Sequence, residues 1–296
     1  MRNTTTSTGR SVMAFVALVA GILLIFLIPD FGTKAMDAVL KGYEVKITKV
    51  PDPSILLPAA KLVAFFFPFW SALCMVAGTA LVLLSLPIYR GEYWARPIAL
   101  GLLAIPSIAG AYMLGPIMFF AKGAISASLI IALTGLIPYF IILLYEESSI
   151  VDKLTNFFVF TMLGVTAAYN WGNAHSSLRQ LWARPESSVI DHAFSLGIVV
   201  NWTAVILVLI GIPLLAARKQ SGWWLSTIGS LSLLIGTGTL YLGHSNVTEF
   251  LVGTLMALVT VALLLIPKIS GLLIDTGRLK TELIPPLTKS QTEHSA

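Results

Sequence analysis

The chain has 296 residues, of which 56% are hydrophobic and only 11% are charged. This composition excludes a soluble globular domain, because such a domain needs a charged surface that these residues cannot provide. Lysines and arginines outnumber acidic residues by 19 to 14, but they lie in the short segments between apolar runs. There they set membrane topology, so the basic balance does not indicate nucleic acid as a partner.

Apolar runs of about 20 residues recur along the whole chain, and each is long enough to cross a hydrocarbon core of about 30 Å. We predict spans at 11–29, 61–88, 97–120, 123–145, 154–174, 193–216, 223–243 and 247–267. The runs are continuous rather than alternating, and backbone groups in lipid must be satisfied within their own segment, which favours helices over a barrel. The expected fold class is an all-α integral membrane bundle of about eight transmembrane helices, with the lipid bilayer as its partner.

The first run is long for a signal peptide and no convincing cleavage site follows it, so we expect it to remain as a membrane anchor. Residues 31–61 are expected to form an external loop. A short alternating stretch from Tyr43 to Lys49 predicts either a small hairpin or a segment lying on the surface there. Residues 1–284 form a single transmembrane domain in this interpretation. The polar tail, residues 285–296, is expected to be a disordered cytoplasmic segment.

The distribution of lysine and arginine predicts the orientation of the chain. With the N-terminus inside, the inner segments hold eleven of these residues and the outer segments eight, and five of the outer eight lie in the segment 31–61. Without that segment the ratio is eleven to three. We therefore predict a cell-membrane protein with both termini in the cytoplasm.

The spacing of the spans is compatible with an internal repeat. The connections after the first three spans become progressively shorter, and those after spans five to seven follow the same order. A shift of 129 residues places Trp94 on Trp223 and Tyr112 on Tyr241. Because each half would contain four spans, both halves would enter the membrane in the same direction. A four-plus-four parallel tandem repeat is the hypothesis that follows.

Glycines recur every seven residues in the seventh span, at Gly222, Gly229, Gly236 and Gly243. Seven residues return a helix to nearly the same face, so the four glycines form a stripe. Small residues let membrane helices approach closely. The stripe predicts helix packing, either against another span of this chain, which we prefer, or against a second subunit or a gate.

Two further features lie inside the spans. Pro106 and Pro116 make the span 97–120 the strongest candidate for a broken helix, since each proline removes a backbone hydrogen bond. Asn201 is the one amide near mid-membrane, and we expect it to face the bundle interior. Packing through a hydrogen bond is the preferred role for this side chain, and contact with a solute is the alternative.

Three histidines fall near the predicted outer ends of spans: His175, His192 and His244. Imidazole groups with neighbouring carboxylates could bind zinc or copper, or hold a quinone headgroup. Their spacing fits no zinc signature, and polar residues at helix ends need no ligand to explain them. A metal site at these histidines is therefore a hypothesis, and the identity of any cofactor stays open.

Absent features narrow the range of functions. No acidic or basic side chain falls in the interior of a predicted span, which disfavours proton-coupled pumps, and no catalytic motif favours an enzyme. The preferred interpretation is a non-catalytic subunit or scaffold of a membrane assembly, with other membrane subunits as partners. The first alternative is a facilitator of a small neutral or lipid-like solute. The second is a redox or metal-dependent membrane protein that uses the three histidines.

The predicted orientation can be tested with cysteines added to a chain in which the single native cysteine, Cys74, is replaced. An impermeant thiol reagent applied to intact cells should label a cysteine at residue 45 and not one at residue 290. The reverse pattern would reject the orientation.

Overall fold

A computed structural model describes residues 6–50, 53, 56–145, 149–183, 189–243 and 248–274, without the side chains of 189–194. These residues are almost entirely helical, and no strand occurs among them. The helices are α1 (Ser7–Phe26), α2 (Ile28–Ile47), α3 (Leu56–Arg90), α4 (Ala95–Phe120), α5 (Ile125–Leu144), α6 (Ile150–Ala183), α7 (Val189–Ala216), α8 (Gln220–Gly243), α9 (Thr248–Leu265) and α10 (Pro267–Leu273), with a 3-10 turn at Lys122–Ala124.

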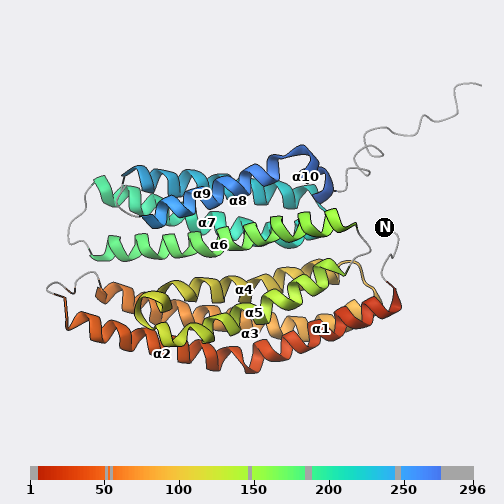
Figure 1. Cartoon of the computed structure of the whole chain (residues 1–296), viewed down its shortest axis with the longest axis horizontal. Helices are drawn as coiled ribbons and strands as arrows, with labels where there is room; N and C mark the ends of the chain where they lie inside the picture. Colours follow the sequence, from red (N-terminus) through yellow and green to blue (C-terminus); the bar gives the residue numbers. More distant parts are fainter. Residues whose placement is uncertain are drawn as a thin grey trace, which may run out of the picture.

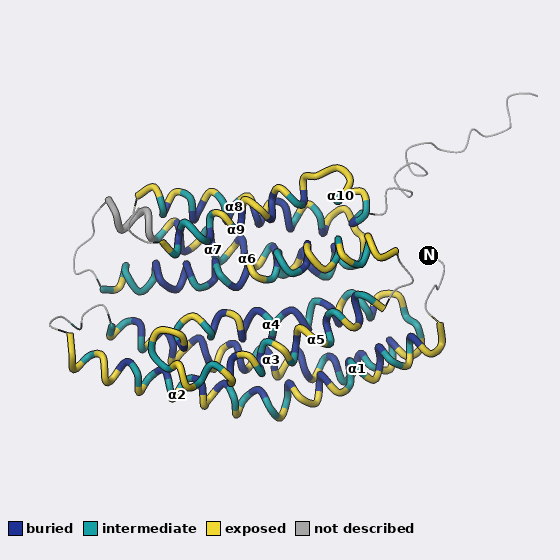
Figure 2. Tube along the Cα trace, viewed as in Figure 1, coloured by how far each residue is buried: buried dark blue, intermediate teal, exposed yellow. Residues whose placement is uncertain are grey.

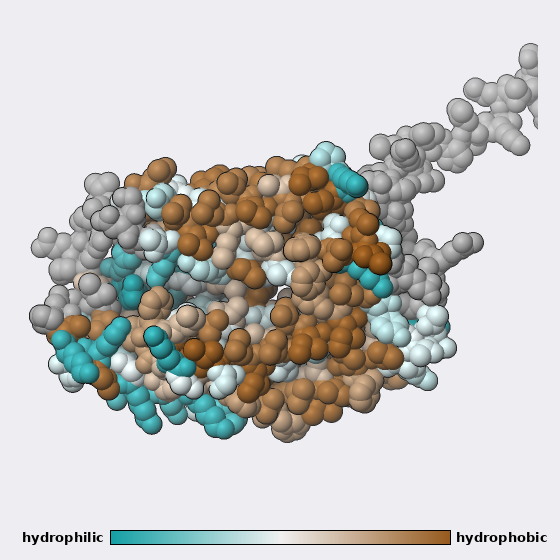
Figure 3. Space-filling view, viewed as in Figure 1, coloured by the Kyte–Doolittle hydropathy of each residue, from teal (hydrophilic) through white to brown (hydrophobic). Residues whose placement is uncertain are grey.

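The structure confirms an all-α multi-pass membrane bundle. Eight helical segments in the described part of the chain are long and apolar enough to cross a membrane. Hydrophobic side chains cover the middle of the face shown in Figure 3, and hydrophilic side chains gather at the end formed by α2. Large apolar side chains such as Phe26, Leu83 and Ile235 are exposed on the outer faces of the helices, where they contact lipid.

The helices form two layers (Figure 1). Helices α1 to α5 make one half and α6 to α10 the other. Within each half consecutive spans pack on each other, and the first span also packs on the last, α1 on α5 and α6 on α9. The halves meet mainly through α3 and α4 on one side and α6 and α7 on the other, and buried residues gather where the layers face each other (Figure 2). This arrangement is the one that a four-plus-four repeat requires, and the repeat itself stays a prediction.

The segment predicted as an external loop, with either a hairpin or a surface-lying stretch, is largely helical, and no hairpin occurs in its described part. Helix α2 continues the direction of α1 after an interruption at Leu27, just before Pro29. It buries a stripe of five residues against the bundle: Ile28, Gly32, Ala35, Val39 and Tyr43. In the alternating stretch from Tyr43, Tyr43 and Ile47 also fit the helical period that begins at Ile28, whereas Val45 is 54% exposed.

The span with two internal prolines, which was predicted to be a broken helix, is continuous in the structure. Helix α4 runs unbroken from Ala95 to Phe120, with Pro106 and Pro116 inside it. Pro106 packs beside Gly135 of α5, and the neighbouring Ser107 hydroxyl donates a hydrogen bond to the Leu103 carbonyl. Hydroxyl groups and close neighbouring helices compensate for the backbone bonds that proline removes, so these prolines do not divide the helix.

The tightest contact within the second half is an antiparallel seam between α7 and α8. A Cβ atom added to Gly229 would lie 2.8 Å from Val208 and 2.9 Å from the carbonyl oxygen of Ala204. Gly222 lies against Leu214 and Leu215 in the same way. Three of the four glycines in the α8 stripe thus face α7, and nothing lies within 4 Å of a Cβ added to Gly243.

The α7 side of this seam carries a matching pattern of small residues. Gly197, Ala204 and Gly211 recur every seven residues, and Gly197 and Gly211 lie against Leu240 and Ser226 of α8. Both helices therefore expose little side-chain bulk to each other, and their backbones approach closely. In a bilayer this close approach supplies the dispersion contact that the hydrophobic effect does not provide between helices.

Similar seams hold the first half together. Gly21 of α1 and Gly78 of α3 pack so that a Cβ added to either would lie 2.7 Å from the carbonyl oxygen of the other. Gly110 of α4 likewise lies against the backbone of α5 at Ser128 and Ala132. The bundle therefore consists of closely paired hairpins.

In each half, a side chain at the start of the third span forms hydrogen bonds with backbone carbonyls near the end of the fourth span. Arg96, at the start of α4, donates hydrogen bonds to the carbonyl oxygens of Ile142 and Leu143 at the end of α5. The Trp223 indole, at the start of α8, donates to the Leu264 carbonyl near the end of α9, at 2.8 Å. Both interactions satisfy carbonyls that a helix end leaves unpaired.

The α7–α8 seam predicts different outcomes for two glycines of the stripe. Gly229→Leu should destabilise the protein by about 1–3 kcal/mol or more, because the side chain would overlap the α7 backbone. Gly243→Leu is the matched control, since it lies in the same helix with open space around it. Thermal unfolding in one detergent measures both. Equal effects of the two changes would contradict the seam as the site of close packing.

Candidate functional site

Seven ring-bearing side chains meet at the junction of the two halves, and we call them the aromatic cluster. They come from α3, α4, α6 and α7: Phe66, Phe69, Trp70, Tyr112, Trp171, His175 and Trp202. Phe66 is the centre of the cluster, with ring centroids 5.8 Å from Trp171, 5.8 Å from His175 and 5.7 Å from Trp202. One phenylalanine of the first half is therefore inserted between rings of the second half.

His175 and Tyr112 join the halves by a hydrogen bond. The Tyr112 hydroxyl lies 2.5 Å from His175 Nδ1, and both side chains are buried. If the Tyr112 hydroxyl donates to Nδ1, the imidazole carries its own proton on Nε2. If Nδ1 donates to the hydroxyl oxygen, the hydroxyl keeps its proton for another acceptor. In either tautomer the pair keeps one further donor for another partner.

Three indole groups of the cluster have no hydrogen-bond partner among the described residues. The Nε1 atoms of Trp70, Trp171 and Trp202 are all buried. Trp70 and Trp171 are only 1% and 7% exposed as whole residues. A buried donor without a partner costs about 1–3 kcal/mol. Three such donors in one cluster mark a place where acceptor atoms are needed.

Arg179 lies on the same face of α6 as His175 and Trp171, because the three residues are spaced four apart. Its terminal nitrogen donates to the Ser176 hydroxyl at 3.4 Å, while its Nε is buried with no partner in the described part of the chain. Burial raises the pKa of Tyr43 in α2 to about 12, and the nearby Arg179 guanidinium opposes this rise. Arg179 thus lies close to α2 as well as to the cluster.

A recess of about 410 Å³ lies where α3 begins and α6 ends. Its lining is Leu57, Pro58, Lys61, Trp182 and Ala183. The α3 residues that follow Lys61 at helical spacing are Phe65 and Phe69, which are exposed, and Phe69 stacks on Trp171. Lys61 of the recess and Phe69 of the aromatic cluster thus lie eight residues apart on α3. We call this end of the bundle the α2 end, and the opposite end the termini end.

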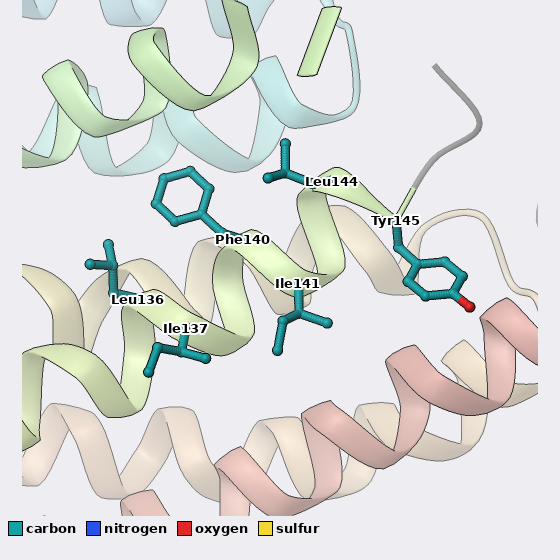
Figure 4. A pocket seen from close by; sticks show the side chains of 6 residues that line it. All are labelled: Leu136, Ile137, Phe140, Ile141, Leu144 and Tyr145. Atoms are coloured by element: carbon teal, nitrogen blue, oxygen red, sulfur yellow. The ribbon is translucent and has the colours of Figure 1, made fainter. Parts of the chain in front are cut away.

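A second recess, of about 540 Å³, lies on the outer face of α5. Leu136, Phe140 and Leu144 point towards α6, and Ile137 and Ile141 point towards α1 (Figure 4). The only side-chain polar atom in its lining is the Tyr145 hydroxyl. This recess suits a lipid acyl chain and offers no group for chemistry or for specific recognition.

The structure places only part of the predicted histidine group. His175 is buried eight residues before the end of α6, bonded to Tyr112, rather than at the end of a span. His244 lies outside the described residues, and so does the side chain of His192, so a site shared by the three stays a prediction. No three metal-ligating side chains of the described residues are grouped for a metal ion.

Asn201 lies in the α7–α8 seam and is 0% exposed. A Cβ added to Gly236 would lie 2.9 Å from its Oδ1 atom, so the glycine provides the space that the amide occupies. Neither amide atom has a hydrogen-bond partner in the described residues. The structure places Asn201 in the bundle interior, as expected. The hydrogen-bond partner expected for its side chain is not among the described groups.

A separate polar seam between α6 and α9 is fully bonded. The Thr166 and Thr260 hydroxyls lie 2.7 Å apart, and Asn173 donates to the Asn170 side chain at 3.2 Å. Gly253 of α9 lies directly against both asparagines. Because these groups satisfy each other, this seam has a packing role.

Sequence reasoning missed Arg179 and the phenylalanine-rich start of α3. The predicted span 154–174 ends five residues before Arg179, so this prediction places Arg179 in a connecting segment. A helical reading at spacing four, from Trp171 through His175 to Arg179, would have found the face that these residues share. The run from Phe65 to Trp70 also indicates an aromatic cluster, since five of its six residues are aromatic.

The fold and site define a polytopic helical membrane protein with two four-span halves and an aromatic junction between them. No protein-family model, no curated protein and no solved structure matches this chain.

The bond between the halves predicts a difference between two tyrosines. Tyr112→Phe should lower stability by about 1–3 kcal/mol, because it leaves the buried His175 Nδ1 without its partner. Tyr139→Phe is the control, since the buried Tyr139 hydroxyl has no partner among the described groups and its loss should be neutral or stabilising. Thermal unfolding under identical conditions compares them. A Tyr112→Phe variant as stable as Tyr139→Phe would contradict the role of this bond.

Proposed function

We propose that the protein is a facilitator that binds a small lipid-like solute between its two halves and releases it on the other side of the membrane. The observation that carries this proposal is the aromatic cluster with its three unpaired indole donors at the junction of the halves. Binding pockets for apolar ligands combine such ring surfaces with a few placed polar groups. In two-fold transporter folds the substrate also lies at the interface of the repeats.

The two ends of the junction differ, which supports a transport role. At the α2 end a recess lies between the start of α3 and the end of α6. At the termini end the halves touch, because a Cβ added to Gly101 of α4 would lie 3.0 Å from the ring of Pro213 in α7. A facilitator that alternates its access needs one open and one closed end in each state. Separation of Gly101 from Pro213 is then the step that releases the solute.

The subunit interpretation loses one of its two supporting observations. It rests on the glycine stripe and on the absence of charged side chains inside the spans, and Gly222, Gly229 and Gly236 lie against α7 of the same chain. The unpaired groups at the junction of the halves are buried within this chain, between its own helices. We therefore prefer the facilitator.

A reversible cross-link across the termini end tests the proposal. Gly101→Cys and Pro213→Cys would be combined with Cys74→Ala, and the separation of about 3.0 Å between their Cβ positions is near the 3.5–4.5 Å of a disulfide. Purified protein in liposomes would be given three probes that share one ring system: naphthalenesulfonate, trimethylnaphthylammonium and naphthyl glucoside.

Uptake of at least one probe should depend on the protein, stop on oxidation of the cysteine pair and return on reduction, because the cross-link would prevent the halves from separating. The two single-cysteine variants are the controls and should transport under both conditions. Equal uptake with oxidised and reduced pairs, or no protein-dependent uptake of any probe, would overturn the facilitator.

A further inference from the structure

The polar groups around the aromatic cluster have one chemical property in common. Indole nitrogen and the guanidinium group are hydrogen-bond donors and cannot accept. Trp70, Trp171 and Trp202 each present a buried indole N–H, and Arg179 presents a buried Nε–H, all without partners among the described side chains and backbone groups. The His175–Tyr112 pair keeps a further donor in either tautomer.

The charge around the recess has the same sign. Lys61 lines its opening, and Arg179 lies one helical turn from His175, between that opening and the cluster. Neither residue forms an ion pair with a described acidic side chain, and the one such pair in the described part joins Lys34 and Asp30 on the exposed face of α2. A guanidinium whose Nε is buried attracts an anion more strongly than it would in water.

The other component of the site is apolar. Phe66 and Phe69 lie beside Trp171 with centroid distances of 5.8 and 6.4 Å, and these rings lie where the two halves meet. Such surfaces bind an aromatic or aliphatic body and provide no acceptor for a polar one. A positively charged ligand would gain contact with the ring faces, but Arg179 and Lys61 repel it.

We infer that the solute is an amphipathic organic anion, with a carboxylate, sulfonate or phosphate headgroup at Arg179 and an apolar body in the aromatic cluster. This inference rests on the proposed facilitator and names its substrate class. The oxyanion accepts hydrogen bonds from Arg179 and from an indole N–H, and so satisfies donors that the protein leaves unpaired. The position of Arg179 near the interface also lets a headgroup enter with little loss of hydration.

Binding of the three naphthyl probes to the full chain in nanodiscs tests the class, with empty nanodiscs subtracted. Calorimetry should show naphthalenesulfonate bound about tenfold or more tightly than trimethylnaphthylammonium or naphthyl glucoside, since a charge-assisted hydrogen bond distinguishes them. This comparison uses the unaltered protein and does not depend on the folding of any variant. Equal affinities, or tighter binding of the cation or the glucoside, would overturn the inference.

Substitutions then locate the headgroup. Arg179→Gln should weaken naphthalenesulfonate binding about tenfold and change glucoside binding by less than about twofold, and Arg179→Lys should retain part of the preference. Lys41→Gln removes an exposed cation of α2 and is the charge-matched control. Equal losses in Arg179→Gln and Lys41→Gln would show that general surface charge, and not Arg179, selects the anion.

The outcomes separate this inference from the function on which it rests. One outcome is selective sulfonate binding that Arg179→Gln abolishes, with no protein-dependent uptake of any probe. It would support the anion site and overturn the facilitator. The other outcome is uptake of the glucoside or the cation, blocked by the Gly101–Pro213 cross-link, with no preference for the sulfonate. It would support the facilitator and overturn the anion class.

Discussion

Close contact between helix backbones across small residues is the constraint on which this bundle depends. Lipid chains are as apolar as leucine, so burial of apolar side chains does not by itself drive membrane helices together. Glycines at Gly21, Gly78, Gly110 and Gly229 place one backbone directly against another, and dispersion contact replaces the missing driving force. The hairpins α1–α3, α4–α5 and α7–α8 are held in this way, and the position of every other side chain follows from them.

The junction between the halves is built on a different principle. Large rings from α3, α4, α6 and α7 meet there, and the direct polar link that they include is the bond from Tyr112 to His175. Rings fill the space at this surface, whereas small residues bring helix backbones together in the glycine seams. In the facilitator that we propose, the two halves would move against each other at this surface.

Buried polar groups divide in the same way. Between α6 and α9 the threonine and asparagine side chains satisfy each other, which is the usual condition for polar groups within a membrane bundle. At the junction, three indoles and one guanidinium nitrogen have no partner among the described groups, although each would lower its free energy by finding one. Unpaired buried atoms also occur elsewhere among the described residues, for example at Tyr139, Asn201 and Ser226, and those at the junction have in common that they can only donate.

The sequence by itself determined the class of protein, the eight spans and the interior position of Asn201. Hydropathy suffices for this because lipid requires every crossing segment to be a long apolar helix, whatever its neighbours are. The seven-residue spacing of glycines in α8 also predicted a packing face, since helical geometry alone places them together.

Only the tertiary structure decided which helix that face meets, that α2 is a helix and that α4 is unbroken. These outcomes depend on partners distant in the chain, as the matching stripe of Gly197, Ala204 and Gly211 illustrates. The candidate site belongs to the same category: Arg179, Phe66 and Trp202 are far apart in sequence, and the packing of two separate halves brings them together.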